Sequence, residues 1–93
     1  MRITWDEAKR QRTLTERGLD FADAARIWDG LTFTVETYAG TDPVRYKTIG
    51  RLDGVIVTFV WTPRAQNERR IISMRRAHGQ ELRLFREEED KLD

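Results

Sequence analysis

The 93-residue sequence has no cysteine, a single histidine and two prolines. Without cysteine it can form no disulfide, no thiol nucleophile and no cysteine-bound zinc site, and His78 alone cannot build a histidine-rich metal site. We therefore expect no metal and no other cofactor. Long apolar runs are also absent, since the longest, residues 55–60, is far below the roughly 20 residues that span a bilayer. The charged start, MRITWDEAKRQR, lacks the apolar core of a signal peptide, so we expect a cytoplasmic protein with no membrane contact.

The formal net charge of +1, from 17 lysines and arginines and 16 acids, conceals an uneven distribution. The last seven residues, EEEDKLD, carry a net charge of −4, which leaves +5 for residues 1–86. Fourteen of the cations are arginine, whose planar guanidinium binds phosphate or carboxylate groups through paired hydrogen bonds. The length fits one domain, 1–93, that ends in an acidic tail at about 87–93.

Helical signals occupy the first third of the chain. Residues 2–5 are β-prone, and Asp6 then provides an N-terminal cap for a helix that we expect to end at Arg17, before Gly18. Asp20 begins a second, short helix. Its apolar stripe has the helical spacing i, i+3, i+4 and i+7 and consists of Phe21, Ala24, Ala25 and Trp28.

From Leu31 the apolar period changes to two, which is typical of strands. We expect strands over residues 31–36, 44–52, 55–61 and 69–74, with a turn at 39–43, a tight Asp-Gly turn at 53–54 and a polar connection at 62–68. A last helix is expected from Arg75 or Arg76, with a frayed acidic end. This order predicts an α+β fold, an antiparallel β-sheet with two N-terminal helices and one C-terminal helix, and with the helices on one face.

The other face of such a sheet is free to bind a ligand, and alternation along each strand predicts which side chains stand together. At the last strand, one face would carry Ile71, Ser73 and Arg75, and the other Arg70, Ile72 and Met74. On the strand 44–52, one face would carry Arg45, Lys47, Ile49 and Arg51. Cations of neighbouring strands are therefore expected to converge.

Four segments in order resemble the BrnT family of type II toxins, and they cover nearly the whole chain. They are ITWDEAK (3–9), RGLDFADA (17–24), RYKTIG (45–50) and RIISMRRA (70–77), with Glu81 downstream. The resemblance implies a RelE-like fold and a ribonuclease that inhibits translation. It also implies a BrnA-like antitoxin with a ribbon-helix-helix DNA-binding dimer. DNA would be reached only through that antitoxin, in a heterotetramer of two toxins and two antitoxins.

RNA cleavage without a metal ion needs a proton acceptor for the ribose 2′-OH, cations that stabilise the phosphorane and a proton donor for the leaving 5′-oxygen. The candidates for phosphate binding are Arg45, Lys47, Arg64, Arg70 and Arg75. The candidates for proton transfer are Tyr46, His78 and Glu81. The predicted catalytic set joins the five cations to Glu81.

Each candidate also has a structural interpretation. Arg75 and Glu81 could simply pair with each other, Tyr46 could pack in the core and His78 could be a solvated side chain. Of the tryptophans, Trp5 and Trp28 are expected in the core. Trp61, at the end of an apolar strand, is the best placed to contact a nucleotide.

Two other functions remain open. Many members of the family carry Lys-His-Gly where this chain has Glu16-Arg17-Gly18, Asn in place of Thr13, and an acidic pair where this chain has Pro43-Val44. These departures favour, as an alternative, a catalytically inactive homologue that binds the antitoxin and co-regulates its operon. A stand-alone RNA-binding module would instead stack bases on paired aromatic residues of the sheet, such as Tyr46 and Phe59.

Overall fold

Five strands and three α-helices make up the part of the chain that the computed structural model describes, residues 1–37 and 43–92. In chain order they are β1 (Arg2–Trp5), α1 (Glu7–Arg17), the 3₁₀ turn η1 (Phe21–Asp23), α2 (Ala24–Trp28), β2 (Thr32–Thr37), β3 (Arg45–Leu52), β4 (Val55–Arg64), β5 (Glu68–Arg76) and α3 (Gln80–Asp90). The expected α+β fold is confirmed. Of the expected turn at 39–43, only Pro43 lies within the described residues. None of the helices in this part is long and apolar enough to cross a membrane.

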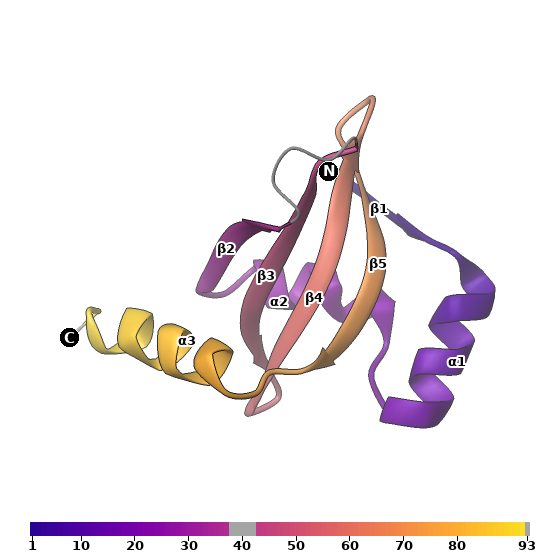
Figure 1. Cartoon of the computed structure of the whole chain (residues 1–93). Coiled ribbons are helices and arrows are strands. Elements are labelled where there is room, and N and C mark those ends of the chain that lie inside the picture. Colours follow the sequence, from indigo (N-terminus) through magenta and orange to yellow (C-terminus); the bar gives the residue numbers. More distant parts are fainter. Residues whose placement is uncertain (38–42, 93) are drawn as a thin grey trace.

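The strands form one sheet in the order β1-β5-β4-β3-β2 (Figure 1). In the series β2, β3, β4 and β5, each strand pairs antiparallel with the next. The turn between β3 and β4 is the expected one, because Asp53 and Gly54 both have positive φ angles, 50° and 84°. β1 pairs in parallel with β5, so the five-stranded sheet is mixed and not purely antiparallel as expected. No hairpin joins these two strands, so local turn chemistry does not dictate their relative direction.

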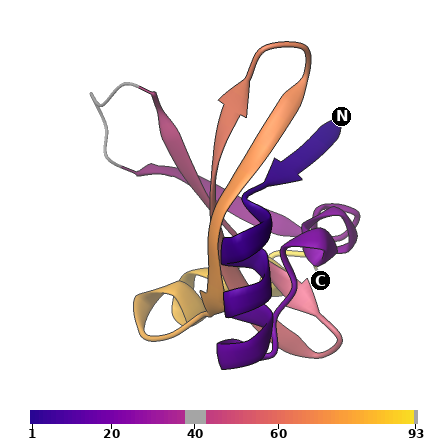
Figure 2. The same cartoon turned by 90° about the vertical axis from the view of Figure 1, so that its right-hand side faces the viewer.

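Helices lie on both faces of the sheet (Figure 2). α2 covers the face that we call the packed face, whose core consists of Leu19, Phe21, Ala24, Ile27, Val57, Phe59, Trp61, Ile71 and Met74. α3 covers one end of the opposite face, where Phe85 and Leu82 pack with Ile49 and Ile56. The expectation that the helices share one face is therefore wrong for α3, which has a second, smaller core to cover. We call the rest of this second face the basic face, since it carries Arg45, Lys47, Arg64, Arg70 and Arg75.

The ends of α1 agree with the sequence prediction. The side chain of Asp6 accepts hydrogen bonds from the backbone N–H groups of Ala8 and Lys9 at 2.9 and 3.4 Å. At the other end, Gly18 has a φ angle of 70° and its N–H donates to the carbonyl of Leu14. Both caps are local, which is why the sequence alone predicts them.

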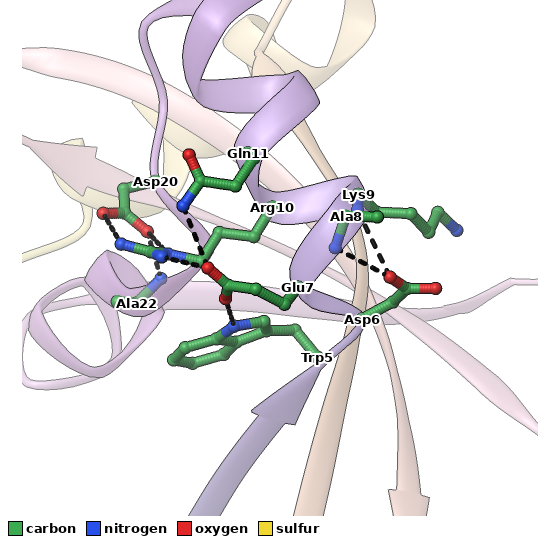
Figure 3. Close-up of polar contacts among 9 residues, drawn as sticks. All are labelled: Trp5, Asp6, Glu7, Ala8, Lys9, Arg10, Gln11, Asp20 and Ala22. Carbon is green, nitrogen blue, oxygen red and sulfur yellow. Dashed lines mark hydrogen bonds and ion pairs between the residues drawn. The ribbon is translucent and has the colours of Figure 1, made fainter.

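Side-chain contacts tie α1 to the segments before and after it (Figure 3). The guanidinium of Arg10 donates to both carboxylate oxygens of Asp20 at 2.7 and 3.0 Å, which connects α1 to η1. The carboxylate of Glu7 accepts from the indole N–H of Trp5 and from the amide of Gln11, both at 2.9 Å. The first helix is thereby fixed beside β1 and η1.

The second helical segment is buried along a different stripe from the expected one. Its first turn is the 3₁₀ turn η1, in which side chains recur every three residues. The buried residues are therefore Phe21, Ala24 and Ile27, whereas Trp28 is half-buried and Ala25 is exposed. The expected stripe is wrong for Ala25, because an α-helical phase from Phe21 onward does not hold through the 3₁₀ turn.

Ile27 packs so closely on β3 that glycine is required at position 50. A Cβ atom on Gly50 would lie 2.5 Å from Cγ2 of Ile27 and 3.2 Å from Cγ2 of Thr32. We expect Gly50→Ala to lower the free energy of unfolding by about 1–3 kcal/mol, because the buried Ile27 has little room to move. Gly30→Ala is the matched control, since a Cβ there meets only a carbonyl oxygen at 3.8 Å. Urea unfolding measures both variants, and equal losses would contradict this explanation.

β4 and β5 are longer than expected. The polar residues 62–68 are not a connection, because they extend both strands and leave only 65–67 as the turn. Gln66 and Asn67 have positive φ angles of 66° and 60°, as a tight turn between antiparallel strands demands. Pro63 lies past the last β4 residue in register with β3 and has a register partner only in β5, Arg69, so it occupies an edge position of the kind where proline is found in sheets.

A β-bulge at Ile72 decides which side chains of β5 share a face. Val60 of β4 pairs with Ser73, but the next residue, Trp61, pairs with Ile71, so Ile72 is the extra residue. The packed face consequently receives Ile71 and Met74, and the basic face receives Arg70, Ser73 and Arg75. The alternation predicted from the sequence is therefore wrong for Arg70 and Ile71, since it assumed an unbroken strand.

α3 begins later than expected. Residues 75–76 belong to β5, and the helix starts at Gln80, after Gly79 with a φ angle of 56°. The helix extends into the acidic end of the chain, through residues 87–90. Nε and Nη2 of Arg51 donate to the carboxylate of Glu89 at 2.6 and 2.9 Å and attach this end to β3.

Candidate functional site

One carboxylate connects two of the cations on the basic face. Glu81, in the first turn of α3, accepts hydrogen bonds from Nη1 and Nη2 of Arg75 at 2.7 and 2.8 Å and lies 3.0 Å from Nζ of Lys47. Oγ1 of Thr58 and the backbone N–H of His78 donate to the same carboxylate at 3.1 and 3.3 Å. We call these five residues the Glu81 cluster. It brings β3, β4, β5 and the start of α3 together at one anion.

Glu81 is only 7% exposed, and its carboxylate is ionised at neutral pH. Burial raises its pKa, but the hydrogen bonds from Arg75, Lys47 and His78 outweigh burial and lower the pKa to about 2. The same contact raises the pKa of the Arg75 guanidinium. A carboxylate with so low a pKa is a weak proton acceptor. Its main effect is to hold two cations side by side.

Both cations of the cluster remain accessible to a ligand. The side chain of Lys47 is 29% exposed and that of Arg75 is 36% exposed. Each has more N–H donors than Glu81 uses, so a second anion can bind from the open side. Two cations on one anion can stabilise the negative charge that develops on phosphate oxygens during transfer. Within the described residues, no group of three acidic or histidine side chains is placed to hold a metal ion.

The low pKa of Glu81 predicts that the cluster loses stability in acid. Because this pKa is lower in the folded chain than its ordinary value of 4.5, the stabilisation is complete above pH 4.5 and is lost as the pH falls toward about 2. Between about pH 5 and pH 2, we expect the free energy of unfolding of the wild type to fall by roughly 2–3 kcal/mol more than that of Glu81→Gln. Urea unfolding at a series of pH values tests this, and parallel curves for the two proteins would contradict it.

The other three cations of the predicted set lie farther along the basic face. Arg70 of β5 is half-buried and pairs with Thr62, and Arg64 ends β4 opposite Glu68. Arg45 is half-buried at the start of β3. The structure therefore places the predicted set on one face and brings Lys47, Arg75 and Glu81 into contact.

The aromatic candidates lie on the packed face instead. The rings of Tyr46 and Trp61 stack with their centroids 4.9 Å apart, and Nε1 of Trp61 donates to Oγ1 of Thr48 at 2.8 Å. Phe59 is fully buried in the same core. The nucleotide contact predicted for Trp61 is therefore wrong, because Trp61 is buried, and Tyr46 lies on the face opposite the Glu81 cluster. A base-stacking pair of Tyr46 and Phe59 is excluded for the same reason, and the packing interpretation of Tyr46 is confirmed.

The other two tryptophans pack as expected. Trp5 and Trp28 lie against the core of the packed face. Arg69, which the sequence analysis did not single out, places its guanidinium 4.7 Å from the ring of Trp28 and 4.6 Å from that of Trp61. Its charge is used in cation–π contacts on the packed face, away from the Glu81 cluster.

Two further residues that support the site were missed by the sequence analysis. Thr58 donates to Glu81, and the available signal was a polar residue within an otherwise apolar strand. Nη1 of Arg17 donates to the carbonyl of Met74 at 2.7 Å, directly before Arg75 in β5. No local pattern reveals this second contact, because 57 residues separate its partners.

The fold and the site place the chain among small α+β proteins that carry a basic sheet face beside a C-terminal helix. A family model, described as the ribonuclease toxin, BrnT, of type II toxin-antitoxin systems, matches residues 5–81. The chain belongs to this family, which confirms the resemblance in its sequence. The match ends at Glu81, so that most of α3 lies beyond it.

A solved structure supports the same assignment. The chain is similar to the ribonuclease toxin BrnT from Brucella abortus, with 33% sequence identity and a TM-score of 0.62, over 85% of this chain and 99% of that chain. A search among curated proteins finds no match. The coarse function follows from the family: a ribonuclease toxin of a type II toxin-antitoxin system, with an antitoxin as its partner.

Proposed function

We propose that this chain is an active ribonuclease that cleaves RNA on its basic face without a metal ion and thereby inhibits translation. The observation that carries the proposal is the Glu81 cluster. There, one buried carboxylate lies 3.0 Å from Lys47 and 2.7 Å from Arg75, on a part of the sheet that α3 leaves uncovered. The role of these cations is to bind the phosphate that is cleaved. The wider set of site residues is Arg45, Lys47, Arg64, Arg70, Arg75 and Glu81.

The cleavage is an attack by the ribose 2′-oxygen on the adjacent phosphorus. An O2′–P bond forms and the P–O5′ bond breaks, which leaves a 2′,3′-cyclic phosphate and a 5′-hydroxyl. Arg75 and Lys47 stabilise the added negative charge in the transition state, an effect of about 100- to 1,000-fold in rate for one such donor.

Proton transfer is assigned to the side chains nearest these cations. Lys47 carries an ammonium proton that it can donate to the leaving 5′-oxygen. His78, which is exposed in the link to α3, is the candidate acceptor for the proton of the 2′-OH. Glu81 positions Lys47 and Arg75 and does not itself take the proton, since its pKa is about 2.

The same face is our candidate for the antitoxin interface. A BrnA-like antitoxin with a ribbon-helix-helix dimer would neutralise the toxin by placing acidic or polar groups on the cations that hold RNA. Its dimer would bring two toxin chains into a heterotetramer, and DNA would be contacted through the antitoxin alone. Because RNA and antitoxin compete for one surface in this proposal, the antitoxin needs no separate inhibitory site.

The test is RNA cleavage by the purified chain in excess EDTA. We expect cyclic-phosphate products that appear without added metal and disappear when the antitoxin is added. Cleavage that requires a divalent metal would overturn the metal-independent mechanism. A well-folded chain that binds antitoxin but leaves RNA intact, with and without Mg²⁺, would favour the alternative of an inactive co-regulator of the operon.

A further inference from the structure

The cations of the basic face stand at three successive levels along β4. Lys47 of β3 pairs with Val60, which defines the first level. Arg70 of β5 pairs with Thr62, which defines the second, and Arg64 itself defines the third. Arg45, two residues before Lys47 on β3, belongs to the second level. The three levels lead away from α3 toward the turn between β4 and β5 (Figure 1).

The spacing of these levels fits the backbone of a nucleic acid. Successive levels are two residues apart on β4, which corresponds to roughly 7 Å along a strand. Neighbouring phosphates of an extended single strand are separated by nearly the same distance. The bulge at Ile72 is essential to this match, because it brings Arg70 into register with Thr62 on the basic face.

Each level carries at least one cation. At the first, the side chain of Lys47 and that of Arg75, whose backbone is in register with Thr58, meet at Glu81. The second has the two arginines Arg45 and Arg70. At the third level, the cations Arg64 and Arg2 face one carboxylate, Glu68, which is bonded to Arg2 and opposite Arg64 in register. A phosphate at every level therefore meets at least one cation.

We infer that the basic face binds single-stranded RNA laid along β4, with one phosphate at each of the three levels and the cleaved phosphate at the first. The inference rests on the proposed function for the identity of the anion and adds the form of the substrate. A single strand fits better than a duplex, because the 2′-oxygen must lie in line with the P–O5′ bond. The regular A-form helix does not provide that alignment, whereas an extended strand can. The face is also too short for the two minor grooves that double-stranded RNA offers to proteins.

The experiment measures the binding of uncleavable 2′-O-methyl oligouridines to the intact chain at several salt concentrations. Trinucleotides carry two phosphates and tetranucleotides three, so the salt dependence should steepen by about 0.7 per added phosphate and then level off beyond four nucleotides. Arg64→Ala should bind the tetranucleotide with the salt dependence that the wild type shows for the trinucleotide. The matched control is Arg12→Ala, on the exposed surface of α1, which should keep the full increment.

Two outcomes would overturn the inference. One is a salt dependence that keeps rising with length and is the same in Arg64→Ala. The other is a duplex of the same length that binds as tightly as the single strand. Because the ligands cannot be cleaved, the result is independent of activity. If the three-level pattern holds but unmodified RNA stays intact, only the proposed cleavage fails; if RNA is cleaved but the pattern is absent, only the three-level binding fails.

Discussion

Replacing Arg75 by alanine is expected to reduce RNA cleavage by at least about 100-fold. Arg75 contributes the guanidinium that is held in place by two hydrogen bonds to Glu81, at 2.7 and 2.8 Å, while its side chain stays 36% exposed toward a ligand. Its removal takes away transition-state stabilisation and also leaves the buried Glu81 carboxylate with fewer partners. The measurement is single-turnover cleavage of a short RNA in EDTA, together with urea unfolding to confirm that the variant is folded.

The next residue of β5 provides a matched control for this prediction. Arg76 is exposed and pairs with Val57, whose side chain belongs to the packed face. Arg76→Ala removes the same charge from the same strand, and we expect little change in cleavage. Arg75→Lys should fall between the wild type and Arg75→Ala, because it keeps the charge but loses the paired hydrogen bonds. Equal effects of Arg75→Ala and Arg76→Ala would indicate that only net charge matters.

In living cells, the wild type and Arg75→Ala can be compared by their effects on growth and on RNA integrity. Expression of the wild-type chain without its antitoxin is expected to arrest growth and degrade RNA, and Arg75→Ala is expected to do neither. A harmless, well-folded wild type would remove the basis for the catalytic proposal and leave the cations of the basic face as an antitoxin-binding surface.

The second large effect is expected at Phe85. This side chain is 1% exposed in the small core under α3, so Phe85→Ala should lower the free energy of unfolding by about 3–5 kcal/mol. Phe85 lies one helical turn after Glu81 and anchors the helix that carries it. With a weaker anchor, Glu81 restrains Lys47 and Arg75 less well, and cleavage should fall even among the molecules that remain folded. The measurement combines urea unfolding with cleavage rates.

A milder pair of variants separates positioning from stability. Phe85→Leu and Phe59→Leu each change one fully buried phenylalanine, on opposite faces of the sheet, and each should cost about 1 kcal/mol. Only Phe85→Leu is expected to slow cleavage under conditions where both variants are folded. If the two lose the same fraction of activity, α3 has no specific positioning role.

This role gives a function to the segment that follows the family match. The match ends at Glu81, whereas the helix continues to Asp90 and is fastened to β3 by the Arg51–Glu89 ion pair. The residues after Glu81 therefore contain no member of the predicted catalytic set, yet they hold the helix turn on which Glu81 lies. These residues hold Glu81 in position, and the Glu81 carboxylate in turn holds Lys47 and Arg75.

Local features of this protein were predictable from the sequence because their causes lie within a few residues. The cap at Asp6, the left-handed end of α1 at Gly18 and the turn at Asp53–Gly54 each depend on backbone preferences of neighbouring residues. The period of two likewise placed Arg45 and Lys47 on one face of β3. The ordered motifs were sufficient for the family assignment, which the family match confirms.

Long-range pairing decided how the basic face and the Glu81 cluster are assembled. Only the register of β5 against β4 puts the bulge at Ile72, and this bulge moves Arg70 onto the basic face. The same level of structure buries Trp61 in the packed core and brings α3 across the opposite face, where Glu81 meets Lys47 and Arg75. Composition and periodicity specify that a strand has two faces. Contacts between segments far apart in the chain decide which face of the sheet is covered by the main core and which carries α3 and the cations. Those contacts are set by the packing of the whole fold.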